Sequence, residues 1–237
     1  MIYTTFGKTG LRVSRLGFGA MRLPMAGQGR SARVDDDKAI QIMHHAFRAG
    51  VNFVDSAVFY CNSDSQRAVG EALKAWPDRI IISTKNSYKD RDERLWWKNL
   101  EDSLRLLGVQ CIDIYNIHGL SWKVWCELGE PLLSKWLLKA RDQGLIRHIG
   151  ASTHETPDGF DKLIDTGFFE SFIVQYNMLD RQLEAGIARA RARGIGIAVA
   201  GFGPFPGVRR NPSAEIVRAI ARSPRIRATG ALLATAV

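Results

Sequence analysis

Short apolar runs alternate with longer segments of helical period along most of this 237-residue chain. The runs have strand length, and the longer segments place apolar residues three and four positions apart. Several of these segments end on a glycine just before the next run, which is typical of a helix end. The repeat of strand, loop and helix predicts an α/β fold with a parallel sheet. The predicted strands are residues 15–20, 52–56, 79–85, 111–118, 146–152, 171–177 and 195–202, and the predicted helices are residues 35–50, 63–76, 93–108, 130–144, 156–167 and 180–194.

A parallel barrel of the (β/α)8 TIM type is the natural closure of this alternation. Residues 2–7 and 11–14 predict a hairpin in front of it, and no linker divides residues 1–237, which are expected to form one domain. Only about seven βα units are predicted, because the residues after Phe202 offer one or two short helices but no credible eighth strand. The eighth strand and the final helix are therefore expected to be missing, which would leave two strand edges unpaired.

The formal charge of +9 is concentrated toward the end of the chain. Residues 181–227 hold ten arginines and two glutamates, and so account for +8 of it. Basic charge without interleaved aromatic residues is a weak indication of nucleic-acid binding, and none is expected. The start lacks the apolar core of a secretory signal and no run is long enough to span a bilayer, so a cytoplasmic protein without membrane contact is expected. Three cysteines without CxxC spacing predict neither disulfides nor a metal site.

Titratable residues stand at the ends of three successive predicted strands. Asp55 ends the second strand, Lys85 the third and His118 the fourth, while Tyr60 lies in the loop after Asp55. In a parallel barrel the carboxyl ends of the strands meet at one mouth, where active sites form. Each residue alone has an ordinary structural explanation, such as a lysine that extends its amine to water. Their shared position at strand ends favours a catalytic site.

The four side chains suit the reduction of a carbonyl group. A carboxylate that leaves water needs a cationic partner, and Lys85 is the expected partner of Asp55. The ammonium of Lys85 is in turn expected to lower the pKa of Tyr60, so that the phenol can act as a general acid and base. His118 can donate a hydrogen bond to the substrate oxygen as negative charge develops on it. None of these groups is a reductant, so a bound cofactor must supply the hydride.

The chain resembles the aldo-keto reductase family. The similarity rests on FGKTGLRVSRLGFGAMRLP, VNFVDSAVFY, IIISTK, LEDSLRLLGVQCIDIYNIHG, GLIRHIGAS and VQYNMLD, which span roughly residues 1–207. Several of these segments are most similar to a bacterial branch in which some members add an iron-sulfur domain, but its cysteine cluster is absent here. The resemblance implies that Tyr60 is the proton donor, with Lys85 and Asp55 beside it, and that His118 orients a small aldehyde or ketone.

The resemblance also implies a nicotinamide cofactor, NADPH or alternatively NADH. Ser152 and Gln175 match the residues that hydrogen-bond the nicotinamide carboxamide, and Phe202 matches the aromatic ring that stacks on the nicotinamide. The first strand lines the same pocket with Gly19, Ala20 and Met21. No GxGxxG lies between a strand and a helix, which agrees with a dinucleotide site that is not of the Rossmann type.

The incomplete ending leaves three explanations open. The sequence is a fragment or the product of a shifted reading frame, or a natural truncation whose open edge a second copy or a partner chain covers, or an inactive relative. The main hypothesis is an NAD(P)H-dependent oxidoreductase that reduces an aldehyde or ketone to an alcohol. The alternative is a catalytically inactive truncated barrel that serves as a binding or regulatory subunit.

Overall fold

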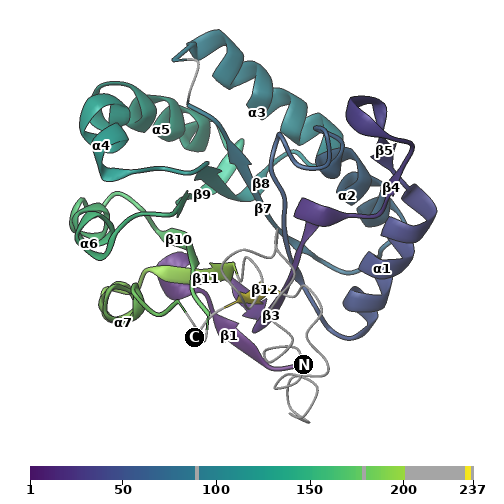
Figure 1. Ribbon diagram of the computed structural model, residues 1–237, viewed down its shortest axis with the longest axis horizontal. Helices are drawn as coiled ribbons and strands as arrows, with labels where there is room; N and C mark the ends of the chain where they lie inside the picture. The colour runs from purple at the N-terminus through teal and green to yellow at the C-terminus, as the bar shows by residue number, and fades with distance from the viewer. Residues whose placement is uncertain (89–90, 178–179, 201–232, 236–237) are drawn as a thin grey trace.

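Seven parallel strands form most of the wall of a closed barrel, with helices outside it (Figure 1). The structure is a computed structural model that describes residues 1–88, 91–177, 180–200 and 233–235. The predicted α/β barrel and all seven predicted strands are confirmed. Around the wall the parallel strands are β3 (Leu16–Gly19), β6 (Phe53–Asp55), β7 (Ile81–Asn86), β8 (Ile112–Ile117), β9 (Ile146–Thr153), β10 (Ser171–Gln175) and β11 (Gly196–Ala200).

The gap between the first and last parallel strands is closed by a short strand of opposite direction, β12 (Leu233–Thr235). Ala234 pairs antiparallel with Val199 on one side and with Leu16 on the other. The expectation of a helix and of two unpaired edges was therefore wrong at this point. The physical reason is that the backbone groups of both edges need hydrogen-bond partners, and β12 pairs with Ala198 and Val199 on one edge and with Leu16 and Gly17 on the other.

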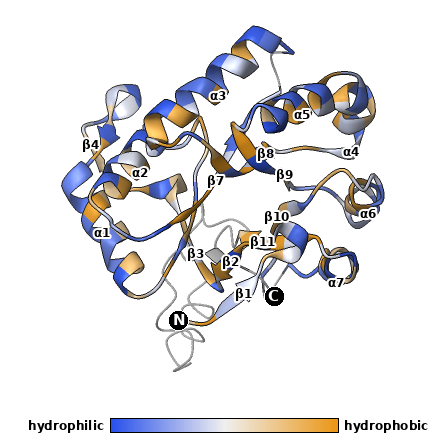
Figure 2. Cartoon of the chain, turned by 180° about the vertical axis from the view of Figure 1, so that it is seen from behind, coloured by the Kyte–Doolittle hydropathy of each residue, from blue (hydrophilic) through white to orange (hydrophobic). Residues whose placement is uncertain are grey.

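Six helices pack on the outside of the barrel at the predicted positions. Several begin at side-chain caps: Asp92 accepts hydrogen bonds from two amides of the following helix, and Thr156 caps a helix that starts with Pro157. Figure 2 shows hydrophobic residues along the strands and mixed polarity on the helices. The helices are α1 (Asp36–Arg48), α2 (Ser65–Lys74), α3 (Glu93–Leu107), α5 (Ser134–Asp142), α6 (Pro157–Asp165) and α7 (Glu184–Ala192). Among the described residues, none of the helices is long and apolar enough to cross a membrane.

The helical segment after β8 begins earlier than predicted. A short helix, α4 (Trp122–Val124), leads into a π-helical segment, Trp125–Leu133, and only then into α5. Pro131 lies inside the π-helical segment and has no amide hydrogen for a regular helical bond, so a wider turn is accommodated there. Trp125 fills the space over Gly129, where a Cβ would lie 2.4 Å from its ring.

An N-terminal hairpin closes one end of the barrel. Strands β1 (Tyr3–Thr5) and β2 (Arg12–Ser14) pair antiparallel, as predicted. The hairpin presses Phe6 and Val13 against apolar side chains inside the barrel, and the rings of Phe6 and Phe53 lie 5.9 Å apart. The barrel residues in this cluster are Phe53, Ile81, Ile114, Ile173 and Ala198. The hairpin end of the barrel is thus filled with apolar side chains, and polar side chains of the strands lie toward the carboxyl ends.

Replacing Phe6 by alanine should destabilise the whole barrel. Phe6 is 2% exposed, and removal of a buried phenyl ring lowers the free energy of unfolding by about 3–5 kcal/mol. Urea unfolding followed by circular dichroism measures the change. Phe59→Ala is the matched control, because Phe59 is 54% exposed and its loss should have little effect. Equal destabilisation by the two changes would contradict the role of Phe6 in closing the barrel.

Candidate active site

A buried ion pair between Asp55 and Lys85 lies at the carboxyl ends of β6 and β7. The two residues are 4% and 2% exposed, and the ammonium of Lys85 donates directly to the carboxylate of Asp55. Lys85 also donates to the backbone oxygen of Ser56 at 2.8 Å, while the hydroxyl of Ser83 donates to Asp55 Oδ1 at 2.8 Å. Asp55 therefore has the cationic partner that its burial requires, and that partner is the expected one.

Tyr60 and His118 lie next to this pair. The ring centroid of Tyr60 is 4.8 Å from Lys85 Nζ, so the ammonium lies over the face of the ring. The imidazole of His118, directly after β8, meets the Tyr60 ring edge to face with centroids 5.7 Å apart. The structure thus brings together all four residues that the sequence analysis proposed as catalytic.

The pKa of Tyr60 is raised above its ordinary value, which corrects the expected fall. Burial is the largest cause, because it disfavours the phenolate. The charge of Lys85 and a hydrogen bond with it lower the pKa, whereas the charge of Asp55 raises it. The expected fall took account of the ammonium alone, whereas desolvation outweighs the effect of the ammonium. The phenol is therefore protonated at neutral and mildly alkaline pH.

The turn that follows Tyr60 is held in an unusual backbone conformation. Cys61, Asn62 and Ser63 have φ angles of 52°, 55° and 65°, in the left-handed region that residues other than glycine rarely adopt. Asn62 Nδ2 ties the turn to a neighbouring hairpin by donating to the backbone oxygens of Gly29 and Ala32, both at 3.1 Å. That hairpin consists of β4 (Met25–Ala26) and β5 (Arg33–Val34).

The segment expected to line the cofactor pocket from the first strand adjoins the ion pair. Gly19 is paired in register with Asp55 across β3 and β6. Ala20 is buried, and its backbone oxygen accepts a hydrogen bond from Ser65 Oγ at 2.7 Å. Met21 follows in the short 3-10 turn Ala20–Arg22 and is 41% exposed. The segment therefore lies beside the catalytic candidates.

Ser152 and Gln175 lie on β9 and β10, at the same end of the barrel. Ser152 Oγ accepts a hydrogen bond from the amide of Gly119 at 2.9 Å, which ties it to the loop that carries His118. Gln175 Nε2 donates to Asp180 Oδ2 at 3.0 Å. Because a carboxylate only accepts, this contact turns the amide oxygen of Gln175 away from Asp180. Phe202, the remaining cofactor candidate, lies outside the described residues.

Three polar residues at this end of the barrel were not predicted from the sequence: Ser83, Asn116 and Asp180. Ser83 comes two residues before Lys85, and Asn116 comes two residues before His118. Side chains two positions apart in a strand point to the same face, so the period of two was a usable signal for both. Asp180 lies in a loop, where the sequence contains no comparable pattern.

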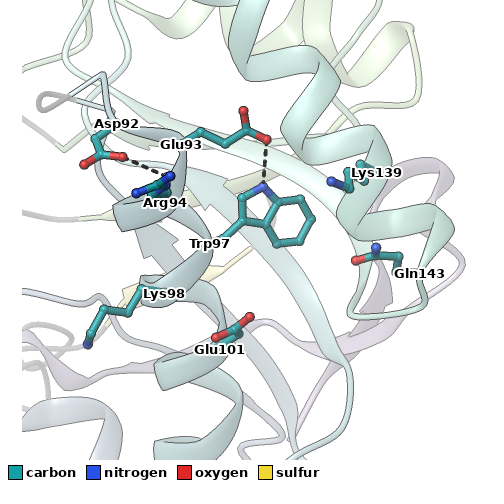
Figure 3. Close-up of a pocket in the computed structure, with 8 residues that line it drawn as sticks. All are labelled: Asp92, Glu93, Arg94, Trp97, Lys98, Glu101, Lys139 and Gln143. Carbon is teal, nitrogen blue, oxygen red and sulfur yellow. Dashed lines mark hydrogen bonds between the residues drawn. The ribbon is translucent and has the colours of Figure 1, made fainter.

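A separate depression of about 790 Å³ lies on the outer surface between α3 and α5 (Figure 3). Trp97 stands at its centre; its indole nitrogen donates to Glu93 Oε1 at 3.2 Å, and Lys139 Nζ lies 5.0 Å from its ring. Charged side chains of both signs surround it, and none of the catalytic candidates lines it. In the part of the chain that the structure describes, no cluster of three or more histidine, cysteine or acidic residues could hold a metal ion.

Asn62→Ala should loosen the turn after Tyr60. Alanine adopts the left-handed conformation less readily than asparagine and loses both hydrogen bonds, so the free energy of unfolding should fall by about 1–2 kcal/mol. Asn62→Gly keeps the backbone conformation and loses only the hydrogen bonds, so it should be the milder change. Thermal and urea unfolding of the two variants measure the difference. A larger loss in the glycine variant would show that the φ angle is unimportant.

Comparison with known proteins agrees with this geometry. The sequence model of the Aldo/keto reductase family matches residues 15–210. An NADH-specific methylglyoxal reductase of Escherichia coli (strain K12) is 27% identical over 220 residues, which cover 84% of this chain and 66% of that protein. The curated relatives are longer, and the chain spans 46% to 66% of their length.

Solved structures of low sequence identity show the same fold. The holo form of aldo-keto reductase AKR11C1 from Bacillus halodurans has a TM-score of 0.72 and 24% identity, over 93% of this chain and 76% of that chain. An aldo-keto reductase from Klebsiella pneumoniae in complex with NADPH has a TM-score of 0.64 and 19% identity, over 83% of this chain and 67% of that chain. Because the family match covers most of its length, this chain belongs to the aldo/keto reductase family.

Proposed function

We propose that this protein is an NAD(P)H-dependent oxidoreductase that reduces a small aldehyde or ketone to an alcohol. The observation that carries the proposal is the buried Asp55–Lys85 ion pair under the ring of Tyr60, with His118 at the ring edge. The phenol beside the pair has a raised pKa, and titratable groups with a shifted pKa are typical of catalytic sites. Membership of the aldo/keto reductase family supports the same reaction class.

The described residues fit a nicotinamide ring. Ser152 Oγ accepts from Gly119, so its own hydrogen can be donated to a carboxamide oxygen. Gln175 gives its amide hydrogen to Asp180, so its oxygen can accept from a carboxamide NH₂ group. Ser152 thus offers a donor for the carboxamide oxygen, and Gln175 offers an acceptor for the carboxamide NH₂ group. When bound, the reduced nicotinamide supplies the hydride.

The proton comes from Tyr60. Its raised pKa keeps the hydroxyl protonated, and the hydroxyl donates its proton to the carbonyl oxygen as that oxygen gains negative charge. The phenolate that results is stabilised by the ammonium of Lys85, which the carboxylate of Asp55 holds in place. His118 is positioned to hydrogen-bond the same substrate oxygen and to orient the carbonyl group.

NADPH is the proposed cofactor, with NADH as the alternative. One similar structure is a complex with NADPH, whereas one relative is named as NADH-specific. The basic segment is not proposed as a nucleic-acid site. In its described part, Arg181 pairs with Glu184, and Arg189 and Arg193 both pair with Asp165. Three arginines of the described part are thus paired with carboxylates.

Replacing Tyr60 by phenylalanine tests the proton donor. The change removes one hydroxyl and keeps the ring, so kcat for carbonyl reduction should fall by about 100-fold or more while cofactor affinity stays nearly the same. Fluorescence titration with NADPH and with NADH measures binding, and oxidation of the cofactor at 340 nm measures turnover over a panel of aldehydes and ketones. Turnover that survives in the variant would remove Tyr60 from its proposed role. A folded wild-type protein that binds neither cofactor at millimolar concentration would refute the proposed function.

The pH dependence of reduction follows from the direction of the Tyr60 pKa. A phenol donates a proton only below its pKa, and the pKa of Tyr60 lies above the ordinary value of about 10. On the alkaline side, kcat/KM should therefore stay level to about pH 9 and decline only above about pH 10. Enzyme returned to neutral pH after each exposure serves as the control for denaturation. A decline centred below about pH 8 would contradict this assignment.

A further inference from the structure

Two buried polar residues lie beside the ion pair, one in register with Asp55 and the other in register with Lys85. Ser83 on β7 and Asn116 on β8 are each 1% exposed. We propose that Asn116 and Ser83 are positioning residues that direct a chain of hydrogen bonds into Asp55, and thereby hold Lys85 against Tyr60. The inference rests on the proposed function, because it concerns how the proton donor of that reaction is oriented.

The chain of hydrogen bonds runs from Asn116 through Ser83 to Asp55, which also accepts from Lys85 on its other side. Asn116 Nδ2 donates to Ser83 Oγ at 2.9 Å, and Ser83 Oγ donates to Asp55 Oδ1 at 2.8 Å. The second carboxylate oxygen, Asp55 Oδ2, accepts from the ammonium of Lys85. Both oxygens of Asp55 are thus occupied, one by a neutral donor and one by a charged donor.

A single backbone carbonyl determines the direction of the chain. Asn116 Nδ2 also donates to the backbone oxygen of Thr84 at 3.0 Å. A carbonyl oxygen only accepts, so the nitrogen of the Asn116 amide must face β7 and must donate to Ser83 as well. The one hydrogen of the Ser83 hydroxyl is then left for Asp55. The contact with the Thr84 carbonyl therefore fixes which end of the Asn116 amide faces β7.

The direction matters because the ion pair is buried. A carboxylate oxygen without a donor in this environment would attract Lys85 more strongly and draw its ammonium from Tyr60. The charged and titratable groups that face the phenol are Asp55 on β6, Lys85 on β7 and His118 after β8. Lys85 has three hydrogens; Asp55 and the Ser56 backbone oxygen take two, which leaves one on the ammonium that lies 4.8 Å from the ring centroid of Tyr60.

Gly150 on β9 leaves the space that Asn116 needs. The two residues are partners in the register of β8 and β9. A Cβ on Gly150 would lie 2.3 Å from Asn116 Oδ1, which is closer than real atoms approach. Any side chain at position 150 must therefore displace the Asn116 amide. The Thr84 carbonyl on β7 and the space at Gly150 on β9 therefore both determine where the Asn116 amide lies.

The test compares Ser83→Ala, Asn116→Leu and the double variant in the full-length protein. Ser83→Ala should lower kcat for NADPH-dependent reduction about tenfold or more, with KM and the Kd for NADPH within about twofold of wild type. Asn116→Leu should cause an equal or smaller loss. The double variant should be no worse than Ser83→Ala, because Asn116 acts through Ser83. Losses that multiply in the double variant would overturn the chain.

Two further variants separate positioning from structure. Ser83→Thr keeps the hydroxyl and should restore kcat. Ser103→Ala removes a buried hydroxyl that bonds Gln66 and Asn99 outside the chain, so its kcat should match wild type. A kcat for Ser83→Ala equal to that of Ser103→Ala would overturn the inference. If Ser83→Ala fails to fold, Asn116→Leu decides the result: a kcat equal to that of Ser103→Ala would overturn the inference.

The environment of Tyr60 can also be measured by NMR without substrate, so this inference can be tested separately from the proposed reaction. In protein with ¹³Cζ-labelled tyrosine, the resonance of Tyr60 is identified by its loss in Tyr60→Phe. It should shift in Ser83→Ala, return in Ser83→Thr and stay unchanged in Ser103→Ala. If wild-type protein reduces no carbonyl, the proposed function fails, while this shift still supports the positioning chain. An unchanged resonance in Ser83→Ala would overturn the chain even in an active enzyme.

Discussion

The ion pair between Asp55 and Lys85 is the interaction on which the candidate active site depends. Two charges out of water are tolerated only when their geometry is good and their remaining hydrogen-bonding groups are satisfied. Here the carboxylate accepts from Lys85 and Ser83, and the ammonium also donates to a backbone oxygen. Those partners come from β6, β7 and the residue after β6, so the pair exists only when the strands are assembled in register.

The barrel supplies this register through a gradient of polarity along each strand. On β7 the inward positions run from Ile81 to Ser83 to Lys85, and β6 and β8 repeat the order from apolar to polar. The apolar end is closed by the N-terminal hairpin, and the polar end faces the loops. Along each strand the apolar and the polar inward positions are two residues apart, roughly 6–7 Å, and both are buried. Each of these short strands therefore contributes apolar side chains to the core and polar side chains to the candidate active site.

Burial has a second consequence at Tyr60. The same exclusion of water that strengthens the Asp55–Lys85 pair disfavours the phenolate, so the net effect on Tyr60 is a raised pKa. A protonated phenol suits donation of a proton to a carbonyl oxygen, and the nearby ammonium stabilises the anion that forms. The left-handed turn after Tyr60 holds the ring in place at some conformational cost, a pattern often found at functional sites.

Most of the fold and the four catalytic candidates could be predicted from the sequence, since they depend on local periodicity. The period of two and the helical period predicted the seven parallel strands and the outer helices, and strand ends predicted where Asp55, Lys85 and His118 would meet. The antiparallel β12, the π-helical segment before α5 and the chain from Asn116 to Asp55 were not predicted. Each depends on contacts between residues far apart in the sequence, and so does the direction of the Tyr60 pKa. Local pattern thus determined which residues reach the mouth of the barrel, whereas closure of the barrel decided how much water they lose and which atoms they bond, because burial is a property of the assembled wall.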